Sequence, residues 1–123
     1  MSRQRIREDI RRNFADFEYR HVYADEQMLI RLSFQLYYLR KQRGWSKVEL
    51  AERAGLREVT ITQMESGNYE LWSIKTLKRL AEALDLRLTV SFESFGTILS
   101  EMFKCAPKYL ERPSFNDDLE FID

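Results

Sequence analysis

The chain has 123 residues, the length of one domain with extensions, and its 44% hydrophobic and 13% aromatic residues are enough for a modest core. Charges interrupt every apolar stretch before it could span a bilayer, and no hydrophobic signal core follows the arginine-rich start, so we expect a cytoplasmic protein without a membrane partner. The net charge is zero, but residues 1–47 hold 11 Lys/Arg against 6 Asp/Glu, and residues 93–123 hold 3 against 7. This uneven distribution of charge favours a protein whose basic first half contacts the phosphates of a nucleic acid. The alternative is a charge gradient that is simply solvated.

The first predicted element is a basic amphipathic helix within residues 1–24. Its apolar residues Ile6, Ile10, Phe14 and Phe17 recur at helical spacing, and arginines surround them. Such a helix lies on DNA or a membrane surface, or it docks its apolar face on the domain or on a partner subunit. The sequence leaves these alternatives open.

A second helix is predicted over Asp25–Arg43. It ends at Gly44, after basic residues in its last turn. Ser46 and Glu49 then stand three residues apart, as in a capping box, where the serine caps the first turn and the glutamate reaches back. A short third helix therefore begins at Lys47.

A fourth helix is predicted over Glu58–Glu65. Ile61 and Met64 lie one turn apart on it, and we expect them to fill the space between the third and fourth helices. Two short helices joined by a tight turn form a helix-turn-helix hairpin. Ser73 is predicted to cap a last core helix that ends near Leu84.

A β-strand is predicted over residues 87–95. Leu88, Val90 and Phe92 alternate with polar residues there, as in a half-buried strand. Because a lone strand cannot pair its own backbone, we expect it to pair with its own copy in a homodimer. The predicted dimerisation residues are Leu88, Thr89, Val90 and Phe92.

Residues 96–123 are predicted to form an acidic C-terminal extension. It contains Pro107 and Pro113 and one short helix near Thr97–Cys105. We expect its end to be flexible, because acidic residues dominate and apolar clusters are few.

The segment KVELAERAGLREVTITQMES, residues 47–66, carries a specific pattern. The small residue Ala51 stands where two helices must approach, and Gly55 follows four residues later at the turn. This spacing resembles the helix-turn-helix of the lambda-repressor-like family, which includes Cro and the XRE-type bacterial regulators. The resemblance covers Gln27–Leu86, with LRKQRGWSKVELAERAG before the turn and ESGN and TLKRLAEALDL after it. It implies a helical DNA-binding domain at residues 25–86. With the N-terminal helix and the one C-terminal strand that the periodicity predicts, the expected fold is mainly α.

The resemblance also implies which side chains read DNA. The fourth helix would enter the major groove, where Gln63 pairs with adenine, Glu58 accepts from a cytosine amine, and Val59 contacts a thymine methyl. Arg57 stands where many relatives place a serine or threonine cap. The residues that match base-reading positions are Arg57, Glu58, Val59, Thr62 and Gln63.

Phosphate contacts are expected around the hairpin. Lys47 matches the family position that holds a phosphate at the amino end of a helix. Arg40 and Glu65 match a family pair that forms an internal salt bridge, and we interpret them as structural. The predicted phosphate contacts are Lys47, Arg43, Thr60 and Asn68.

These features predict a sequence-specific regulator of transcription, a repressor, that acts as a homodimer on double-stranded DNA with two half-sites. The alternative is an antitoxin. Antitoxins of the HipB and HigA types resemble this core, and some HipB-like ones add a strand that pairs between subunits. An antitoxin would bind a toxin as well as DNA, through the N-terminal helix or the tail after Phe95.

The sequence argues against an enzyme. His21 is the single histidine and Cys105 the single cysteine, so a Ser/His/Asp set would have to use His21, and neither a disulfide nor a structural zinc site can form within the chain. A glycine-rich phosphate loop is missing as well. We therefore predict no catalytic residue, no metal and no cofactor.

Overall fold

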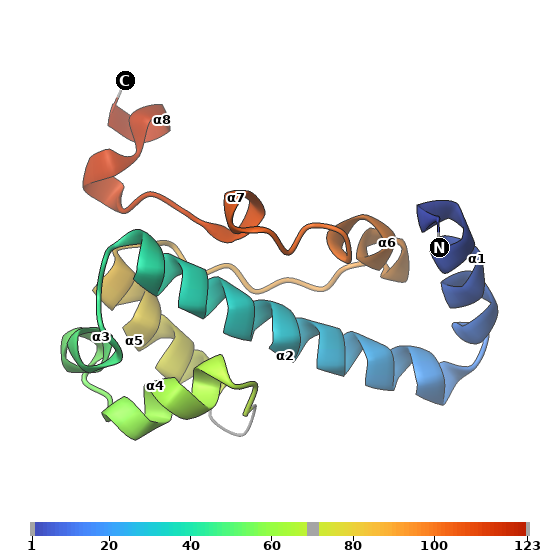
Figure 1. Ribbon diagram of the computed structural model, residues 1–123, viewed down its shortest axis with the longest axis horizontal. Helices are drawn as coiled ribbons and strands as arrows, with labels where there is room; N and C mark the ends of the chain where they lie inside the picture. Colours follow the sequence, from blue (N-terminus) through green and yellow to red (C-terminus); the bar gives the residue numbers. More distant parts are fainter. Residues whose placement is uncertain (1, 69–71, 123) are drawn as a thin grey trace.

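The computed structural model describes residues 2–68 and 72–122 as helices joined by loops. The helix α2 is the axis of the molecule: a pair of short helices and a longer one lie on one side of its C-terminal half, and the C-terminal segment runs along the opposite side (Figure 1). The α-helices are α1 (Arg3–Asn13), α2 (Phe17–Gln42), α3 (Lys47–Ala54), α4 (Glu58–Glu65), α5 (Ile74–Leu84), α6 (Ile98–Glu101), α7 (Pro107–Leu110) and α8 (Leu119–Ile122), and the 3-10 turns are η2 (Phe95–Thr97) and η3 (Phe115–Asp117).

A turn at residues 14–16 separates the first two helices, so α2 begins well before the predicted Asp25. Asp16 sets this start, because its carboxylate accepts a hydrogen bond from the backbone N–H of Tyr19 at 2.7 Å and so caps the first turn. The helix predicted within residues 1–24 is therefore α1 followed by the first turns of α2.

The apolar face of α1 packs on its own chain. Ile10 is buried, and the ring of Phe14 lies 5.1 Å from that of Tyr23 and 5.9 Å from that of Phe95, between centroids. The guanidinium groups of two α1 arginines lie over the ring of Phe103. Of the alternatives left open by the sequence, the structure shows docking on the protein's own helices.

The core lies where α3, α4 and α5 meet α2. Ile61 and Met64 are fully buried between α3, α4 and α2, which confirms the predicted filling of the hairpin. The hydroxyl of Ser33 on α2 donates to the backbone carbonyl of Met64 at 2.9 Å and holds α4 against α2. The buried residues of this core are Leu36, Leu39, Leu50, Ala51, Ala54, Ile61, Met64, Leu80 and Leu84.

Helix α5 begins and ends on local signals. The Ser73 hydroxyl accepts from the backbone N–H of Thr76 at 3.1 Å, which confirms the predicted cap. At the other end Asp85 adopts a left-handed conformation with φ 54°, and the N–H of Leu86 bonds to the carbonyl of Ala81 at 2.8 Å. This closure turns the chain away from the helix.

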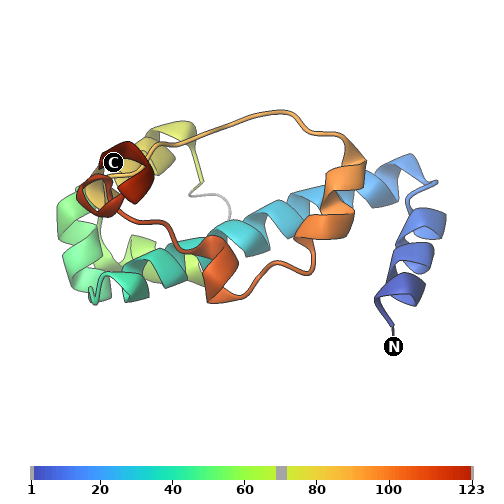
Figure 2. The same cartoon turned by 90° about the horizontal axis from the view of Figure 1, so that it is seen from above.

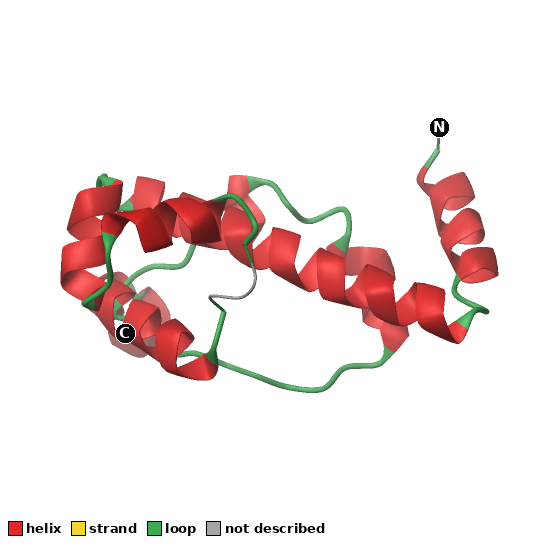
Figure 3. Ribbon diagram, turned by 90° about the horizontal axis from the view of Figure 1, so that it is seen from below, coloured by secondary structure: helices red, strands yellow, loops and turns green. Residues whose placement is uncertain are grey.

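The β-strand predicted after α5 is wrong, because residues 86–94 form a loop and no described residue is in a strand (Figure 3). A strand needs a neighbour that completes its backbone hydrogen bonds, and the backbone of residues 87–93 bonds to no other described backbone group. The four predicted dimerisation residues lie in this loop, where Leu88 is half-buried and Thr89, Val90 and Phe92 are exposed. The predicted strand pairing across a dimer and the predicted HipB-like strand are therefore wrong as well.

The middle of the C-terminal segment packs on α2, whereas the side chains of its last residues, Leu119, Phe121 and Ile122, remain exposed, and the flexibility of this end stays a prediction. The segment runs back along α2 (Figure 2), with Leu110 of α7 fully buried. Gln35 of α2 donates from Nε2 to the carbonyl of Leu110 at 3.1 Å. Arg31, one turn earlier on α2, donates to the carbonyls of Glu101 at 3.2 Å and Lys104 at 2.8 Å. The short helix predicted in this segment is confirmed as α6.

Candidate nucleic-acid interface

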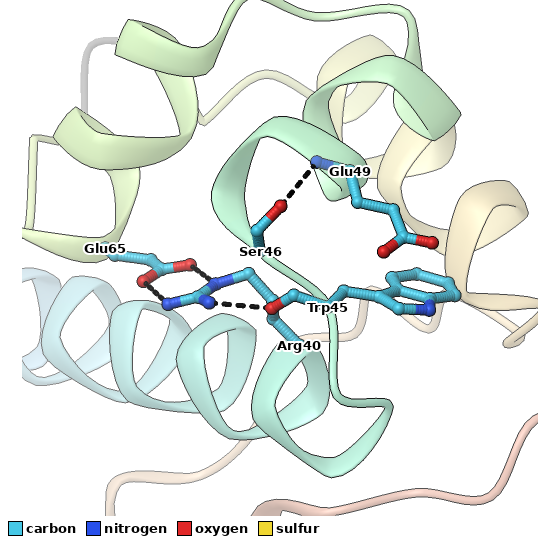
Figure 4. Close-up of polar contacts among 5 residues, drawn as sticks. All are labelled: Arg40, Trp45, Ser46, Glu49 and Glu65. Carbon is cyan, nitrogen blue, oxygen red and sulfur yellow. Dashed lines mark hydrogen bonds and ion pairs between the residues drawn. The ribbon is translucent and has the colours of Figure 1, made fainter.

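The hairpin begins at a capped helix start. The Ser46 hydroxyl accepts from the backbone N–H of Glu49 at 3.1 Å, as predicted (Figure 4). The carboxylate of Glu49 binds Arg53 at 2.9 Å instead of accepting a hydrogen bond from the backbone N–H of Ser46. Only the serine half of the predicted capping box therefore forms. Gly55 ends α3 with φ 67°, a left-handed conformation that glycine adopts without steric cost. The chain thereby turns sharply into α4.

A buried ion pair fixes α4 against α2 (Figure 4). Arg40 donates from Nε to Glu65 Oε2 at 2.7 Å and from Nη2 to Glu65 Oε1 at 2.9 Å. The two side chains are only 7% and 6% exposed, and the hydrogen bond that Arg40 donates to Glu65 raises the pKa of Arg40 above its ordinary value. Nη1 of Arg40 reaches the carbonyl of Trp45 at 2.9 Å, so one guanidinium joins α2, the entry to α3 and the end of α4. This confirms the predicted structural pair.

The outward side of α4 carries the predicted base-reading residues. Because Ile61 and Met64 face the core, the opposite side of this two-turn helix faces solvent. Glu58 and Thr62 lie one turn apart on it, as do Val59 and Gln63, so the side chains form one patch. The structure leaves all five predicted base-reading residues exposed, namely Arg57, Glu58, Val59, Thr62 and Gln63.

The amino end of α4 lacks a side-chain cap. Arg57 holds the cap position with φ −83° and ψ 151°, but its side chain accepts no hydrogen bond there. Glu58 is the first residue of the helix, where a negative charge interacts favourably with the positive end of the helix dipole. Glu58 therefore compensates for the missing cap, whether or not DNA is bound.

The predicted phosphate contacts fall into two groups. Lys47 is the first residue of α3 and is half-buried, and Thr60 is half-buried on α4. Asn68 is exposed just after α4, and its backbone N–H bonds to the carbonyl of Gln63 at 3.0 Å. Thr60 and Asn68 thus lie on α4 or directly after it and Lys47 lies at the start of α3, whereas the side chain of Arg43 bonds to α5 and the C-terminal segment.

Arg43 fastens the C-terminal segment to the helical core. Its Nη2 donates to the carbonyls of Leu84 at 3.1 Å and Arg112 at 3.0 Å. The same nitrogen lies 2.8 Å from the hydroxyl of Ser114. Burial lowers the pKa of this guanidinium, and the nearby charge of Asp117 opposes the shift. A phosphate contact by Arg43 would require these bonds to break, and nothing local in the sequence signals them.

The single histidine lies among aromatic rings. His21 packs on the rings of Phe17 at 4.4 Å and Phe95 at 5.2 Å, between centroids. Within residues 2–68 and 72–122, no three His, Cys, Asp or Glu side chains gather where they could hold a metal ion. Over the same residues, no helix is both long and apolar enough to cross a bilayer.

Comparison with known proteins identifies the hairpin. A family model described as helix-turn-helix matches residues 36–90, which run from the last turns of α2 through α3, α4 and α5. All the predicted DNA contacts lie inside this match. No curated protein and no solved structure matches the chain significantly.

Proposed function

Because residues 36–90 carry a helix-turn-helix domain of the Cro/C1 type, which is a DNA-binding class, we propose that the protein is a repressor that binds specific double-stranded DNA as a dimer. Its α4 enters the major groove and reads base edges. Repression then follows from occupancy of the operator.

The observation that supports this proposal is the rigid presentation of α4. The ion pair of Arg40 with Glu65 and the burial of Ile61 and Met64 hold the helix from its inner side. Its outer side is left with side chains that can hydrogen-bond or contact base edges, above all Gln63. Lys47, at the start of α3, adds a phosphate contact that sets the position of the hairpin on the duplex.

Selection of bound sequences from random duplexes with the purified protein tests the proposal. We expect enrichment of an inverted repeat whose half-sites lie about one DNA turn apart, roughly 34 Å, or a multiple of it. A bound pool with no enriched motif would contradict sequence-specific recognition.

Gln63→Ala should relax the preference at one base pair and weaken binding to the selected site by about 1–3 kcal/mol. The reason is that alanine cannot make the bidentate hydrogen bonds that distinguish adenine from other bases. Fluorescence anisotropy with the selected duplex and its single-base variants measures both effects. Gln4→Ala, the same change on the exposed surface of α1, is the control and should bind as the wild type does. Equal binding and equal preference in Gln63→Ala would show that α4 meets DNA in another register.

Lys47→Ala should weaken binding to all duplexes alike and lower the slope of log affinity against log salt by about one. One phosphate neutralised by lysine releases about one counterion, whatever the base sequence. Anisotropy titrations over a series of salt concentrations give the slope. Lys108→Ala, on α7 across α2 from the hairpin, should leave it unchanged (Figure 1). A sequence-dependent loss in Lys47→Ala would mean that this residue reads bases.

A further inference from the structure

One face of α2 is covered by neither of the segments that pack on this helix. The helical hairpin covers the face with Ser33 and Leu36, and the C-terminal segment covers the face with Gln35. Between them lie Ile30, Phe34 and Tyr37, which remain 53%, 44% and 38% exposed. We name the residues that follow one another along this face the outer stripe: Glu26, Ile30, Phe34, Tyr37 and Lys41.

The aromatic part of the outer stripe is ordered by its neighbours. Phe34 stacks on Tyr38 with centroids 6.4 Å apart and an interplanar angle of 20°. Tyr37 meets Tyr38 edge to face at 5.4 Å, and the ammonium of Lys41 lies 5.8 Å from the ring of Tyr37. An ordered group of exposed apolar side chains on one helix face is typical of an interaction surface.

The spacing of the outer stripe suits a second helix. Ile30, Phe34, Tyr37 and Lys41 are four, three and four residues apart, which is the repeat of a coiled-coil seam. From Glu26 to Lys41 the stripe spans about 22 Å at the rise of an α-helix. It is therefore long enough for a helix pair of about four turns.

The two ends of the outer stripe have opposite charges. Glu26 begins the stripe and Lys41 ends it, and both side chains are exposed. When two copies of α2 lie antiparallel with a two-fold axis beside Phe34, Ile30 of each copy faces Tyr37 of the other. The same axis brings Glu26 opposite the partner's Lys41 at both ends. A parallel pair would place like charges opposite each other, so the charges favour the antiparallel one.

We infer that the outer stripe binds a second copy of this chain, as an antiparallel α2 pair related by a two-fold axis through Phe34. The contact is isologous and closes the assembly at two. The axis is perpendicular to both helices, so both helix-turn-helix units stay on one side of the pair, as an operator with two half-sites requires. This interface rests on the proposed function for its biological role, but its existence is tested without DNA.

The first test is sedimentation equilibrium of Phe34→Asp. A carboxylate at the centre of the seam would face its own copy, so we expect the dimer dissociation constant to rise at least about 100-fold. Met28→Asp is the matched control, because Met28 is also exposed on α2 but lies outside the stripe, and it should dimerise as the wild type does. Circular dichroism melting checks that both variants fold. A folded Phe34→Asp protein with wild-type dimerisation would overturn the interface.

The second test is a charge exchange. Glu26→Lys and Lys41→Glu should each weaken dimerisation about 10-fold, and the double variant should restore it, since the pairs re-form with reversed signs. Single variants that dimerise normally, or a double variant weaker than both, would overturn the antiparallel arrangement. A wild-type protein that dimerises through the stripe but selects no DNA motif would leave the interface standing and contradict the proposed function. A monomeric wild type that selects a single half-site would overturn the interface and the proposed dimer, and would leave only sequence-specific DNA binding standing.

Discussion

Arg40→Ala is expected to lower the free energy of unfolding by about 3–5 kcal/mol, because it leaves the carboxylate of Glu65 buried without its partner. The carbonyl of Trp45 also loses a hydrogen bond from the same guanidinium. Urea unfolding followed by circular dichroism measures the loss. No other salt bridge among the described residues is buried in this way, so we expect this to be one of the most destabilising single changes in the chain.

Arg53→Ala is the matched control for Arg40→Ala. Arg53 pairs with Glu49 one turn away, but both side chains are about half exposed, so its removal should cost less than about 1 kcal/mol. The double variant Arg40→Met/Glu65→Leu should recover most of the stability, since no buried charge remains. If Arg40→Ala is no more destabilising than Arg53→Ala, then the buried pair does not hold α4 in solution.

Leu110→Ala is expected to cost about 2–5 kcal/mol of unfolding free energy. Leu110 is fully buried on α7, and its truncation leaves a cavity between the C-terminal segment and α2. Thermal unfolding followed by circular dichroism measures the change. Lys108→Ala, on the exposed side of the same short helix, should stay within about 0.5 kcal/mol of the wild type. Equal stability of the two variants would show that α7 is not docked.

The core helices could be predicted from the sequence because their signals are local. Ser46 and Ser73 cap the helices that follow them, and the spacing of Ile61 and Met64 identifies the inner side of α4. The start of α2 was misplaced even though its signal is equally local. Asp16 is a good cap, but Phe17 continues the apolar spacing of α1, so the periodicity runs across the break.

The strand and the role of Arg43 could not be predicted, because both depend on distant parts of the chain. The alternation of apolar and polar residues around Val90 indicates only a local preference for extended backbone. A strand exists only where another segment completes its backbone hydrogen bonds. Arg43 has the sequence context of a phosphate contact, but its acceptors at Arg112 and Ser114 arrive only when the C-terminal segment docks. By contrast, the exposure of the predicted base-reading residues needs only the period of α4.

The docking of the C-terminal segment on α2 has a consequence for the order of folding. Gln35 bonds to Leu110 and Gln42 to Arg112, across 75 and 70 residues of chain. The contacts between α3 and α4 close much shorter loops, so they form with a smaller loss of chain entropy. Because the chain is synthesised from its amino end, α3 and α4 are made before α7. We expect the helix-turn-helix hairpin to form while the far side of α2 is still exposed to water, and the last part of the chain to cover it afterwards.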